Sequence, residues 1–225
     1  MIPLDPLGPL EALRTGWQPP SGWQPLAVAP AGTVPHDKAA WRALAESILR
    51  SRPALLRRAH ASRLATEGVA LAQALGARRV GLYSPVGAEV ETRDLANALL
   101  AQGILLAYPR MLPDGVGMDF AECAGPTALA PRPRTRVLEP VGPAVDPTGL
   151  DLVVVPALAL RSDLRRLGRG GGHFDRYLPN LRPDAVTVGC AAAACILDWM
   201  PPEPHDVALN CAVTEAGLHG PARQP

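Results

Sequence analysis

The sequence lacks a strong charge of either sign. Its 225 residues include 22 basic and 21 acidic side chains, which leaves a net charge of +1. A chain without a positive field has no general means to recruit nucleic acid or an anionic membrane surface. Any site for an anion must therefore be built locally.

Cysteine is also scarce, and its spacing excludes two common roles. The four cysteines show neither a CxxC pair nor the spacing of a metal site. Cys190, Cys195 and Cys211 lie among alanine, valine and isoleucine. We therefore expect buried, reduced thiols in a cytoplasmic protein.

No apolar run is long enough to span a bilayer, and the N-terminus lacks the basic start and unbroken apolar core of a signal peptide. Instead, the first thirty-five residues contain eight prolines. Proline at this density removes backbone donors and blocks helix, so residues 1–35 are predicted to form an extended arm. The near repeat around Trp17 and Trp23 fits either a docking tag for a partner or an arm packed loosely on its own domain, which we favour.

Helical periodicity begins after the arm. Asp37 is suited to cap a helix whose apolar residues recur from Trp41 to Ile48. A second helix is predicted from Pro53 to about Leu75, where a glycine follows.

Beyond this pair, strands and helices alternate. Strands are predicted at 80–83, 104–108, 118–121, 152–155, 186–190 and 208–213, with a helix at 92–103. Residues 123–149 are rich in proline and indicate a loop, and the tail 217–225 is expected to fray. The pattern predicts a single α/β domain over 36–216, three-layered, with a mostly parallel sheet flanked by helices and a site at the carboxyl ends of the strands.

The most informative stretch is Leu167–Leu178, with the sequence LGRGGGHFDRYL. Its four glycines in five positions allow positive φ angles that aim successive N–H groups at one point, as phosphate-binding loops do. Arg166, Arg169 and Arg176 add cationic forks that suit phosphate oxygens. Because neither the Rossmann spacing nor a Walker lysine is present, a flexible glycine turn with solvated arginines stays an equal alternative on these residues alone.

This stretch resembles the glycine-rich signature of the 5-formyltetrahydrofolate cyclo-ligase family, also called methenyltetrahydrofolate synthetases. Further segments match the family in the same order: Lys38 and Arg42, Tyr83-Ser84-Pro85 with Glu89 to Thr92, Pro109-Arg110, Leu138 to Pro140, Asp151 to Pro156, and Pro201 to Asp206 leading to Glu215. The resemblance covers nearly everything from Asp37 to Glu215. Each segment is short, but their joint order and spacing are specific.

The resemblance implies an ATP-dependent ring closure on a reduced folate. In this family ATP phosphorylates the formyl oxygen of 5-formyltetrahydrofolate, the neighbouring folate nitrogen attacks the activated carbon, and phosphate leaves. The products are 5,10-methenyltetrahydrofolate, ADP and phosphate. The implied cofactors are ATP and Mg²⁺, and we expect a cytoplasmic monomer or small homo-oligomer with no nucleic-acid or membrane partner.

The resemblance also implies roles for single residues. It assigns Glu89 and Phe174 to the folate, Asp175 and Asp206 to Mg²⁺, and a catalytic role to Arg169 and Asp175. On the residues alone, Asp175 also suits a helix cap, Asp206 a turn, and Glu89 an ordinary loop carboxylate. The residues assigned to ATP are Lys38, Arg42, Arg166, Arg169, Gly170, Gly171, Gly172, His173 and Asp175.

The sequence departs from the family pattern mainly on the folate side. His173 and Phe174 stand where the family usually has tyrosine, Cys195 replaces a glutamine, and Asn210 replaces an aspartate. These departures support a second hypothesis, a nucleotide-binding regulatory or assembly module of the same fold that has lost cyclo-ligase turnover. A dinucleotide-binding oxidoreductase is disfavoured, because no GxGxxG follows an early strand.

Overall fold

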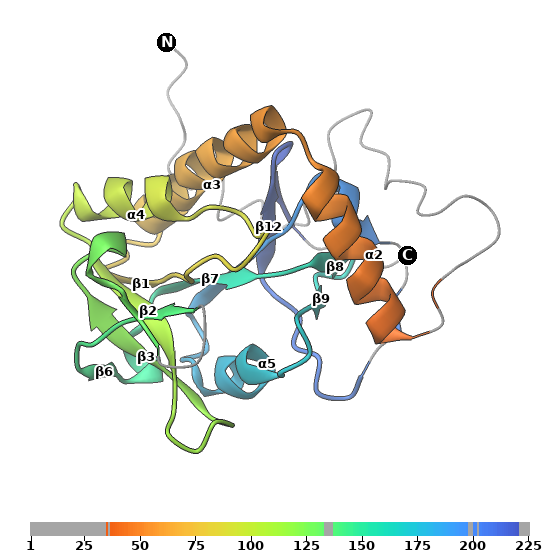
Figure 1. Ribbon diagram of the computed structural model, residues 1–225. Coiled ribbons are helices and arrows are strands. Elements are labelled where there is room, and N and C mark those ends of the chain that lie inside the picture. The colour runs from red at the N-terminus through yellow and green to blue at the C-terminus, as the bar shows by residue number, and fades with distance from the viewer. Residues whose placement is uncertain (1–34, 36, 133–136, 198–199, 202, 221–225) are drawn as a thin grey trace, which may run out of the picture.

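The computed structural model describes residues 35, 37–132, 137–197, 200–201 and 203–220 (Figure 1). Nearly all of the predicted arm, with Trp17 and Trp23, lies outside these residues. The predicted α/β domain lies almost entirely within them.

The first two helices described are α2 (Lys38–Ser51) and α3 (Ala54–Ala74). Asp37 caps α2 as predicted, because its side chain accepts a hydrogen bond of 2.8 Å from a backbone N–H of the first turn. The next helix starts directly after Pro53 and ends just before Gly76, whose φ of +59° suits glycine. The predicted helical pair is confirmed.

The main sheet has eight strands in the order β13-β12-β10-β7-β1-β2-β3-β6. Its central strands, from β12 to β2, are parallel to their neighbours, whereas β13, β3 and β6 are attached by antiparallel pairing. This arrangement confirms the predicted, mostly parallel sheet. The bounds are β1 (Arg79–Gly81), β2 (Leu105–Met111), β3 (Met118–Cys123), β6 (Ala144–Val145), β7 (Leu152–Pro156), β10 (Val186–Cys190), β12 (Cys211–Thr214) and β13 (Gly217–His219).

Helices cover both faces of this sheet, which gives the three predicted layers (Figure 1). On one face, α3 and α4 (Arg93–Leu100) contribute fully buried leucines such as Leu64 and Leu95. On the other face, α5 (His173–Tyr177) packs its Tyr177 ring 5.0 Å from that of Phe120. Burial of these apolar side chains is the main term that holds the layers together.

A small second sheet carries the glycine-rich segment. It comprises β8 (Ala159–Arg161), β9 (Arg166–Leu167) and β11 (Ile196–Leu197) in the order β11-β8-β9. Helix α2 packs on this sheet through Trp41 and Leu49. The glycines therefore lie between strand β9 and helix α5.

The segment 123–149 is not the continuous loop that we predicted. Strands β4 (Ala130–Pro131) and β5 (Leu138–Glu139) pair with each other, and β6 extends the edge of the main sheet. Proline tolerates such short edge pairings, because its missing N–H can face away from the partner strand. Short 3₁₀ helices complete this and other connections: Pro126–Ala128, Pro147–Gly149, Leu178–Asn180 and Ala193–Cys195.

The predicted frayed tail is wrong for residues 217–219, which form β13 against β12. Gly217 makes the tight turn between the two strands with a φ of +135°, and the side chain of His219 is buried. The predicted helix at 92–103 is α4. Thr92 directly precedes it, and its hydroxyl donates to the carbonyl oxygen of Tyr83 at 2.9 Å.

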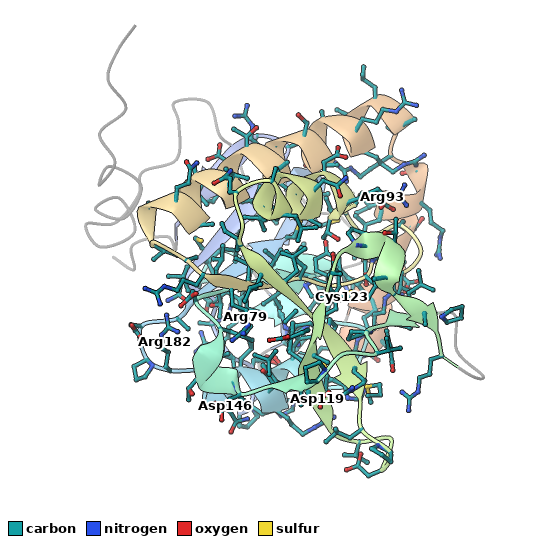
Figure 2. The ribbon with its side chains drawn as sticks, turned by 90° about the vertical axis from the view of Figure 1, so that its left-hand side faces the viewer. Arg79, Arg93, Asp119, Cys123, Asp146 and Arg182 are labelled. Carbon is teal, nitrogen blue, oxygen red and sulfur yellow. The ribbon has the colours of Figure 1, made fainter. Side chains whose placement is uncertain are left out.

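The amino ends of the strands are tied together by Asp151. Its carboxylate accepts hydrogen bonds from the backbone N–H of Arg79 at 2.8 Å and from the side chain of Arg182 at 2.6 Å. Figure 2 shows Arg79 and Arg182 on this side of the molecule. Burial acts to raise the pKa of Asp151, but these hydrogen bonds outweigh it and lower the pKa. This end of the sheet is held by structural contacts, whereas the cavity described below lies at the other end.

The cysteines are buried and free, as predicted. Burial raises the pKa of Cys190 to about 12, so the thiol stays protonated and unreactive at neutral pH. Within the described part of the chain, no helix has the length and apolar character needed to cross a membrane.

Candidate active site

A cavity of about 450 Å³ opens at the carboxyl ends of the parallel strands. Ser84 follows β1, Met111 ends β2 and Pro156 ends β7, and all three line it. The position at the strand ends is the predicted one. The cavity also brings together the residues that the resemblance assigns to ATP, metal and folate: Lys38, Arg42, Glu89, Arg166, Arg169, Gly170, Gly171, Gly172, His173, Phe174, Asp175 and Asp206. Arg176, which the glycine-rich stretch also offered to phosphate, is not among the described residues that line it.

The glycine loop needs its glycines. Gly170 has a φ of +99° and Gly172 a φ of +64°, conformations that side-chain-bearing residues rarely adopt. A Cβ on Gly170 would also lie 3.3 Å from the guanidinium carbon of Arg42. The Nε of Arg42 donates to the carbonyl oxygen of Gly168 at 3.0 Å, so α2 holds the loop in place. These contacts favour a fixed loop over a flexible turn, while its binding of phosphate stays a prediction.

Arg169 connects the loop to α2 and to the segment that follows β1. It donates to Glu89 at 2.7 Å, to Glu46 of α2 at 3.1 Å and to the carbonyl oxygen of Val86 at 2.6 Å. Glu89 in turn accepts a hydrogen bond from the backbone N–H of Val86 at 2.9 Å, and only 7% of its side chain is exposed. The residue predicted to bind phosphate and the residue predicted to bind pterin are therefore paired with each other.

Arg166 lies underneath the loop. Only 5% of its side chain is exposed, and it pairs with Asp175 at 2.8 Å. Its guanidinium also stands 5.3 Å from the centre of the Phe174 ring, a cation–π distance. Burial lowers the pKa of Arg166, and the negative charges of Asp175 and Asp206 oppose that shift. These contacts make Arg166 a residue that positions Asp175 and Phe174, while its contact with ATP stays a prediction.

Asp175 does not cap α5, because the capping position belongs to Gly172 and Asp175 lies in the first turn. Its carboxylate instead pairs with Arg166 and faces the cavity. The alternative role of a helix cap is therefore wrong.

Asp206 lies beside Lys38, the first residue of α2. Its carboxylate accepts hydrogen bonds of 2.7 and 2.9 Å from Lys38, which also contacts Glu203 at 2.7 Å. Asp206 closes a turn as well, because it accepts a hydrogen bond of 2.8 Å from the backbone N–H of Glu203. The turn interpretation of Asp206 is therefore confirmed. Its carboxylate also faces the cavity, and its role in holding Mg²⁺ stays a prediction.

Donor groups for a hard cation gather at this point. Glu203, His205 and Asp206 each place one possible ligand atom within 4.8 Å of the others. Carboxylate oxygens are the ligands that Mg²⁺ prefers, and it commonly takes one or two of them together with phosphate oxygens and water. That Asp175 shares such an ion with Asp206 stays a prediction.

The wall beyond Phe174 is apolar. Its ring meets that of Phe120 edge-on, with 6.2 Å between the ring centres. Met111, at the end of β2, and Met118, at the start of β3, also line the cavity. His173 is turned toward the hairpin between these strands, with its Nδ1 3.1 Å from the carbonyl oxygen of Val116. The predicted contact of His173 with ATP stays a prediction.

The departures at Cys195 and Asn210 lie away from the cavity. Asn210 accepts hydrogen bonds of 2.7 and 2.8 Å from the backbone N–H and hydroxyl of Thr187, and so ties two strands together. Cys195 is buried beneath α2. Neither residue is among those that line the cavity in the described part of the chain.

Sequence reasoning assigned no role to several charged residues of the wall. Arg110 makes two hydrogen bonds to Asp119, at 2.8 and 3.1 Å, and Arg132 pairs with Glu139 at 3.3 Å. Arg110 and Asp119 are directly opposite in the pairing of β2 with β3. Predicting this pair required the antiparallel register, which the sequence pattern alone did not give.

Comparison with known proteins identifies relatives of this arrangement. The model of the 5-formyltetrahydrofolate cyclo-ligase family matches residues 36–215. The chain is 32% identical over 149 residues to a 5-formyltetrahydrofolate cyclo-ligase of Mycolicibacterium smegmatis, covering 62% of this chain and 75% of the relative. It is 27% identical over 191 residues to the mouse (Mus musculus) protein of the same name, covering 79% and 93% of the two chains.

Solved structures show the same fold. The 5,10-methenyltetrahydrofolate synthetase of Aquifex aeolicus superposes with a TM-score of 0.71 at 23% identity, covering 84% of this chain and 94% of the other. That of Mycoplasma pneumoniae superposes with a TM-score of 0.65 at 22% identity, covering 79% and 98%.

Proposed function

Because this chain belongs to the 5-formyltetrahydrofolate cyclo-ligase family, an ATP-dependent group of ligases, we propose that its cavity closes the ring of 5-formyltetrahydrofolate to give 5,10-methenyltetrahydrofolate. The observation that carries the proposal is the convergence of all the residues expected to bind ATP, metal and folate on one cavity at the strand ends. Their positions span 168 residues of the chain, from α2 to the turn before β12.

The reaction balances as two steps. The γ-phosphoryl group of ATP passes to the formyl oxygen, which releases ADP and makes the formyl carbon electrophilic. The neighbouring folate nitrogen then forms a bond to that carbon, and the carbon–oxygen bond breaks as phosphate leaves. Both steps require charge neutralisation and exact placement more than a covalent group on the protein.

The phosphate side of the cavity has the groups for this task. Lys38, Arg42 and Arg169 supply positive charge, and the backbone N–H groups of Gly170–Gly172 add uncharged donors. Lys38 and Arg169 are now held by carboxylates. We infer that the phosphates of ATP replace these carboxylates as partners of the two cations.

Arrival of ATP also prepares the folate side. When Arg169 turns to a phosphate, Glu89 loses its 2.7 Å partner and can accept hydrogen bonds from the pterin ring. Phe174, fixed by Phe120 and Arg166, offers its ring to the same substrate. Because Arg169 holds Glu89 until ATP is bound, ATP binds first and thereby makes Glu89 available to the folate.

The donor set fits Mg²⁺. When bound, the ion would neutralise the phosphate oxygens and stabilise the charge that develops on the transferred group. Asp206 and Asp175 would hold it, with Glu203 close to Asp206. The ammonium of Lys38 lies against Asp206 and has to move toward the phosphates for the carboxylate to become available.

The experiment that tests the function follows the absorbance of the methenyl product with the purified protein, 5-formyltetrahydrofolate and Mg²⁺, with and without ATP. ATP-dependent product formation supports the proposal. The alternative, a nucleotide-binding regulatory or assembly module, predicts that ATP binds but no methenyl product forms. The departures at His173 and Phe174 on the folate side are the observation that favours this alternative.

We further propose that the protein works in the cytoplasm as a monomer or small homo-oligomer. The free, buried cysteines support a reducing compartment.

A further inference from the structure

The tip of the β2–β3 hairpin is fastened to the glycine loop by one side chain. The hairpin projects beyond the sheet beside α5, and its turn covers residues 112–117 (Figure 1). Nη2 of Arg176, on α5, donates to the carbonyl oxygen of Val116 at 2.9 Å and to that of Gly171 at 2.8 Å. A single guanidinium nitrogen therefore joins the hairpin tip to the loop.

The imidazole of His173 completes this contact. Its Nδ1 lies 3.0 Å from Nη2 of Arg176 and 3.1 Å from the carbonyl oxygen of Val116. Nδ1 accepts from the arginine in one tautomer of the neutral ring and donates to the carbonyl in the other, so both tautomers fit here. The ring therefore adds a second link between α5 and the hairpin tip.

The glycine loop leaves room for these two side chains. A Cβ on Gly171 would lie 2.6 Å from Nε2 of His173, and one on Gly172 would lie 2.8 Å from Nη1 of Arg176. Both distances are shorter than van der Waals contact, so a larger residue would push the side chains away from the hairpin. Two glycines of the loop thus serve the hairpin contact as well as the loop itself.

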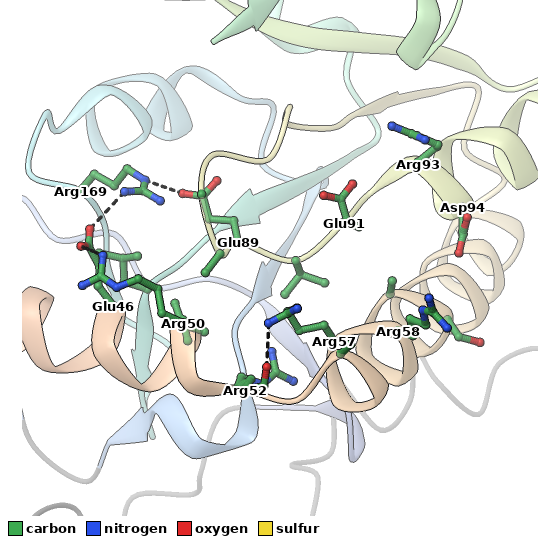
Figure 3. A pocket seen from close by; sticks show the side chains of 18 residues that line it. Glu46, Arg50, Arg52, Arg57, Arg58, Glu89, Glu91, Arg93, Asp94 and Arg169 are labelled. Carbon is green, nitrogen blue, oxygen red and sulfur yellow. Dashed lines mark hydrogen bonds and ion pairs between the residues drawn. The ribbon is translucent and has the colours of Figure 1, made fainter. Parts of the chain in front are cut away.

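Arg176 differs from Arg169, the arginine of the same loop that we place in the mechanism. Arg169 pairs with the carboxylates of Glu89 and Glu46, which phosphates can replace (Figure 3). The partners of Arg176 include two backbone carbonyl oxygens, and Arg176 is not among the described residues that line the cavity. Its position indicates a role that acts through the hairpin and not through direct contact with a ligand.

The hairpin tip sets the position of the apolar wall beyond Phe174. Met111 and Met118 flank the turn, lie opposite each other in the pairing of β2 with β3, and line the cavity. The turn is shaped from within by Asp114, whose carboxylate accepts from the N–H groups of Val116 and Gly117 at 2.8 and 2.9 Å. Fastening this turn to α5 therefore also fixes the two methionines.

We propose that Arg176 is a positioning residue for the folate substrate, because it fastens the hairpin tip to the glycine loop and so holds Met111 and Met118 against the substrate. The inference rests on the proposed function, since it assumes that the ligand beside these methionines is a folate. The contact is remote from the reacting atoms and stabilises the bound substrate and the transition state alike. Its loss should therefore raise KM and leave kcat unchanged.

The test replaces Arg176 with methionine, which keeps the length of the side chain and removes its N–H donors. With a non-hydrolysable ATP analogue and Mg²⁺ present, calorimetry on the full chain should show 5-formyltetrahydrofolate binding about fivefold to tenfold more weakly, because hydrogen bonds from a charged donor are lost. Affinity for ATP should stay within about twofold of the wild type, since Arg42 still holds the loop through Gly168. In the absorbance assay, KM for the folate should rise by the same factor, while kcat changes by less than about twofold.

Two further variants separate positioning from a general structural loss. Arg176→Lys keeps a charged N–H donor of similar reach and should recover part of the folate affinity. Arg63→Met, at an exposed position of α3 where Arg63 pairs with Glu67, is the matched control and should bind the folate as the wild type does.

Hydrogen–deuterium exchange tests the contact without any ligand. Residues 111–118 should exchange about fivefold faster in Arg176→Met than in the wild type, while α3 is unchanged. Equal exchange of the tip in both proteins would overturn the proposal, and so would faster exchange with unchanged folate affinity. A wild type that binds no 5-formyltetrahydrofolate would instead contradict the proposed function, while the exchange comparison still decides whether Arg176 holds the hairpin.

Discussion

Lys38 and Asp206 are joined by two hydrogen bonds, of 2.7 and 2.9 Å, although 168 positions separate them in the chain. Only 10% of the Lys38 side chain and 5% of the Asp206 side chain is exposed. The pair joins the first turn of α2 to the turn before β12 and closes one side of the active-site cavity. The lysine thus occupies the carboxylate that we propose for Mg²⁺.

This competition predicts opposite effects of one substitution. Lys38→Met removes a phosphate-binding charge and also frees Asp206. We expect ATP affinity to fall by about tenfold or more, because a charge-assisted contact is worth about 1.5–3 kcal/mol. Binding of Mg²⁺ without nucleotide should become tighter in the same variant, as calorimetry can show. A parallel loss of both affinities would mean that Lys38 orders the site and does not compete with the ion.

Asp175 and Asp206 are predicted to act on one ion. Asp175→Asn and Asp206→Asn should each weaken Mg²⁺-dependent ATP binding, and the double variant should lose much less than the sum of the two losses. Titration of Mg²⁺ against the three variants gives the comparison, with the exposed Asp184→Asn as a control that keeps wild-type affinity. Losses that simply add would show that the aspartates do not share an ion.

The Asp175 substitution should also affect stability. It leaves the buried guanidinium of Arg166 beside a neutral amide, so we expect a loss of about 1–3 kcal/mol in the free energy of unfolding. Urea denaturation measures it, and the expected loss for Asp184→Asn is close to zero.

Arg169→Ala is predicted to weaken ATP binding by about 1.5–3 kcal/mol. It also removes the arginine partner of Glu89, which then repels an incoming phosphate, whereas Glu46 keeps its contact with Arg50 at 3.2 Å. Calorimetry with ATP and Mg²⁺ is the measurement, and Arg63→Ala is the control. Unchanged nucleotide affinity would show that the glycine loop is a structural turn without a role in ATP binding.

The burial of His60 leads to a prediction of how the free energy of unfolding depends on pH. It is fully buried, with Nε2 3.1 Å from the carbonyl oxygen of Val213 and Nδ1 3.5 Å from Glu215. Burial lowers its pKa to about 4, although Glu215 acts in the opposite direction. The unfolded chain gains a proton near pH 6.5, whereas the folded chain resists protonation until about pH 4. Stability is therefore complete above pH 6.5 and is lost as the pH falls from 6.5 toward 4, by on the order of 3 kcal/mol.

Urea denaturation between pH 7.5 and 4.5 tests this dependence. His60→Gln should flatten it in part, because burial also lowers the pKa of His219 and that residue contributes in the same direction. The exposed His205→Gln should leave it unchanged. A wild-type stability that is constant over this range would show that His60 is not held neutral in the folded protein.

Deletion of residues 1–33 is predicted to leave the α/β domain folded, because α2 has its own cap at Asp37 and its own packing on the small sheet. Thermal unfolding followed by circular dichroism should stay cooperative. Aggregation or loss of cooperativity would place the proline-rich arm in the core.

Much of the fold could be predicted because local patterns agree with the final structure. Asp37 and Gly76 mark helix ends through their own backbone and side-chain chemistry, and the apolar run of β7 is buried on both faces. The errors fall at short strands whose own sequence pattern is weak and which form by pairing with another strand. Strand β13 forms only because β12 offers an open edge, and the tail sequence carries no strong signal of its own.

In the candidate site, too, local sequence patterns were predictable and contacts between distant residues were not. The glycine loop and its arginines were visible in the sequence because several chemically suited residues are consecutive. The partners were not visible, since the contacts of Arg169 with Glu89 and of Lys38 with Asp206 span 80 and 168 positions. Pairing of this kind is decided by topology, which brings the strand ends together, and not by local propensity.

The contact between α2 and the turn at Asp206 also has a consequence for synthesis of the chain. A ribosome that has made α2, α3 and the first strands has produced Lys38 but not the carboxylate that meets it. β12 and the contacts that α3 makes with it are still missing at that stage. We therefore expect that the proposed nucleotide site is complete only after the turn at Asp206 has left the exit tunnel.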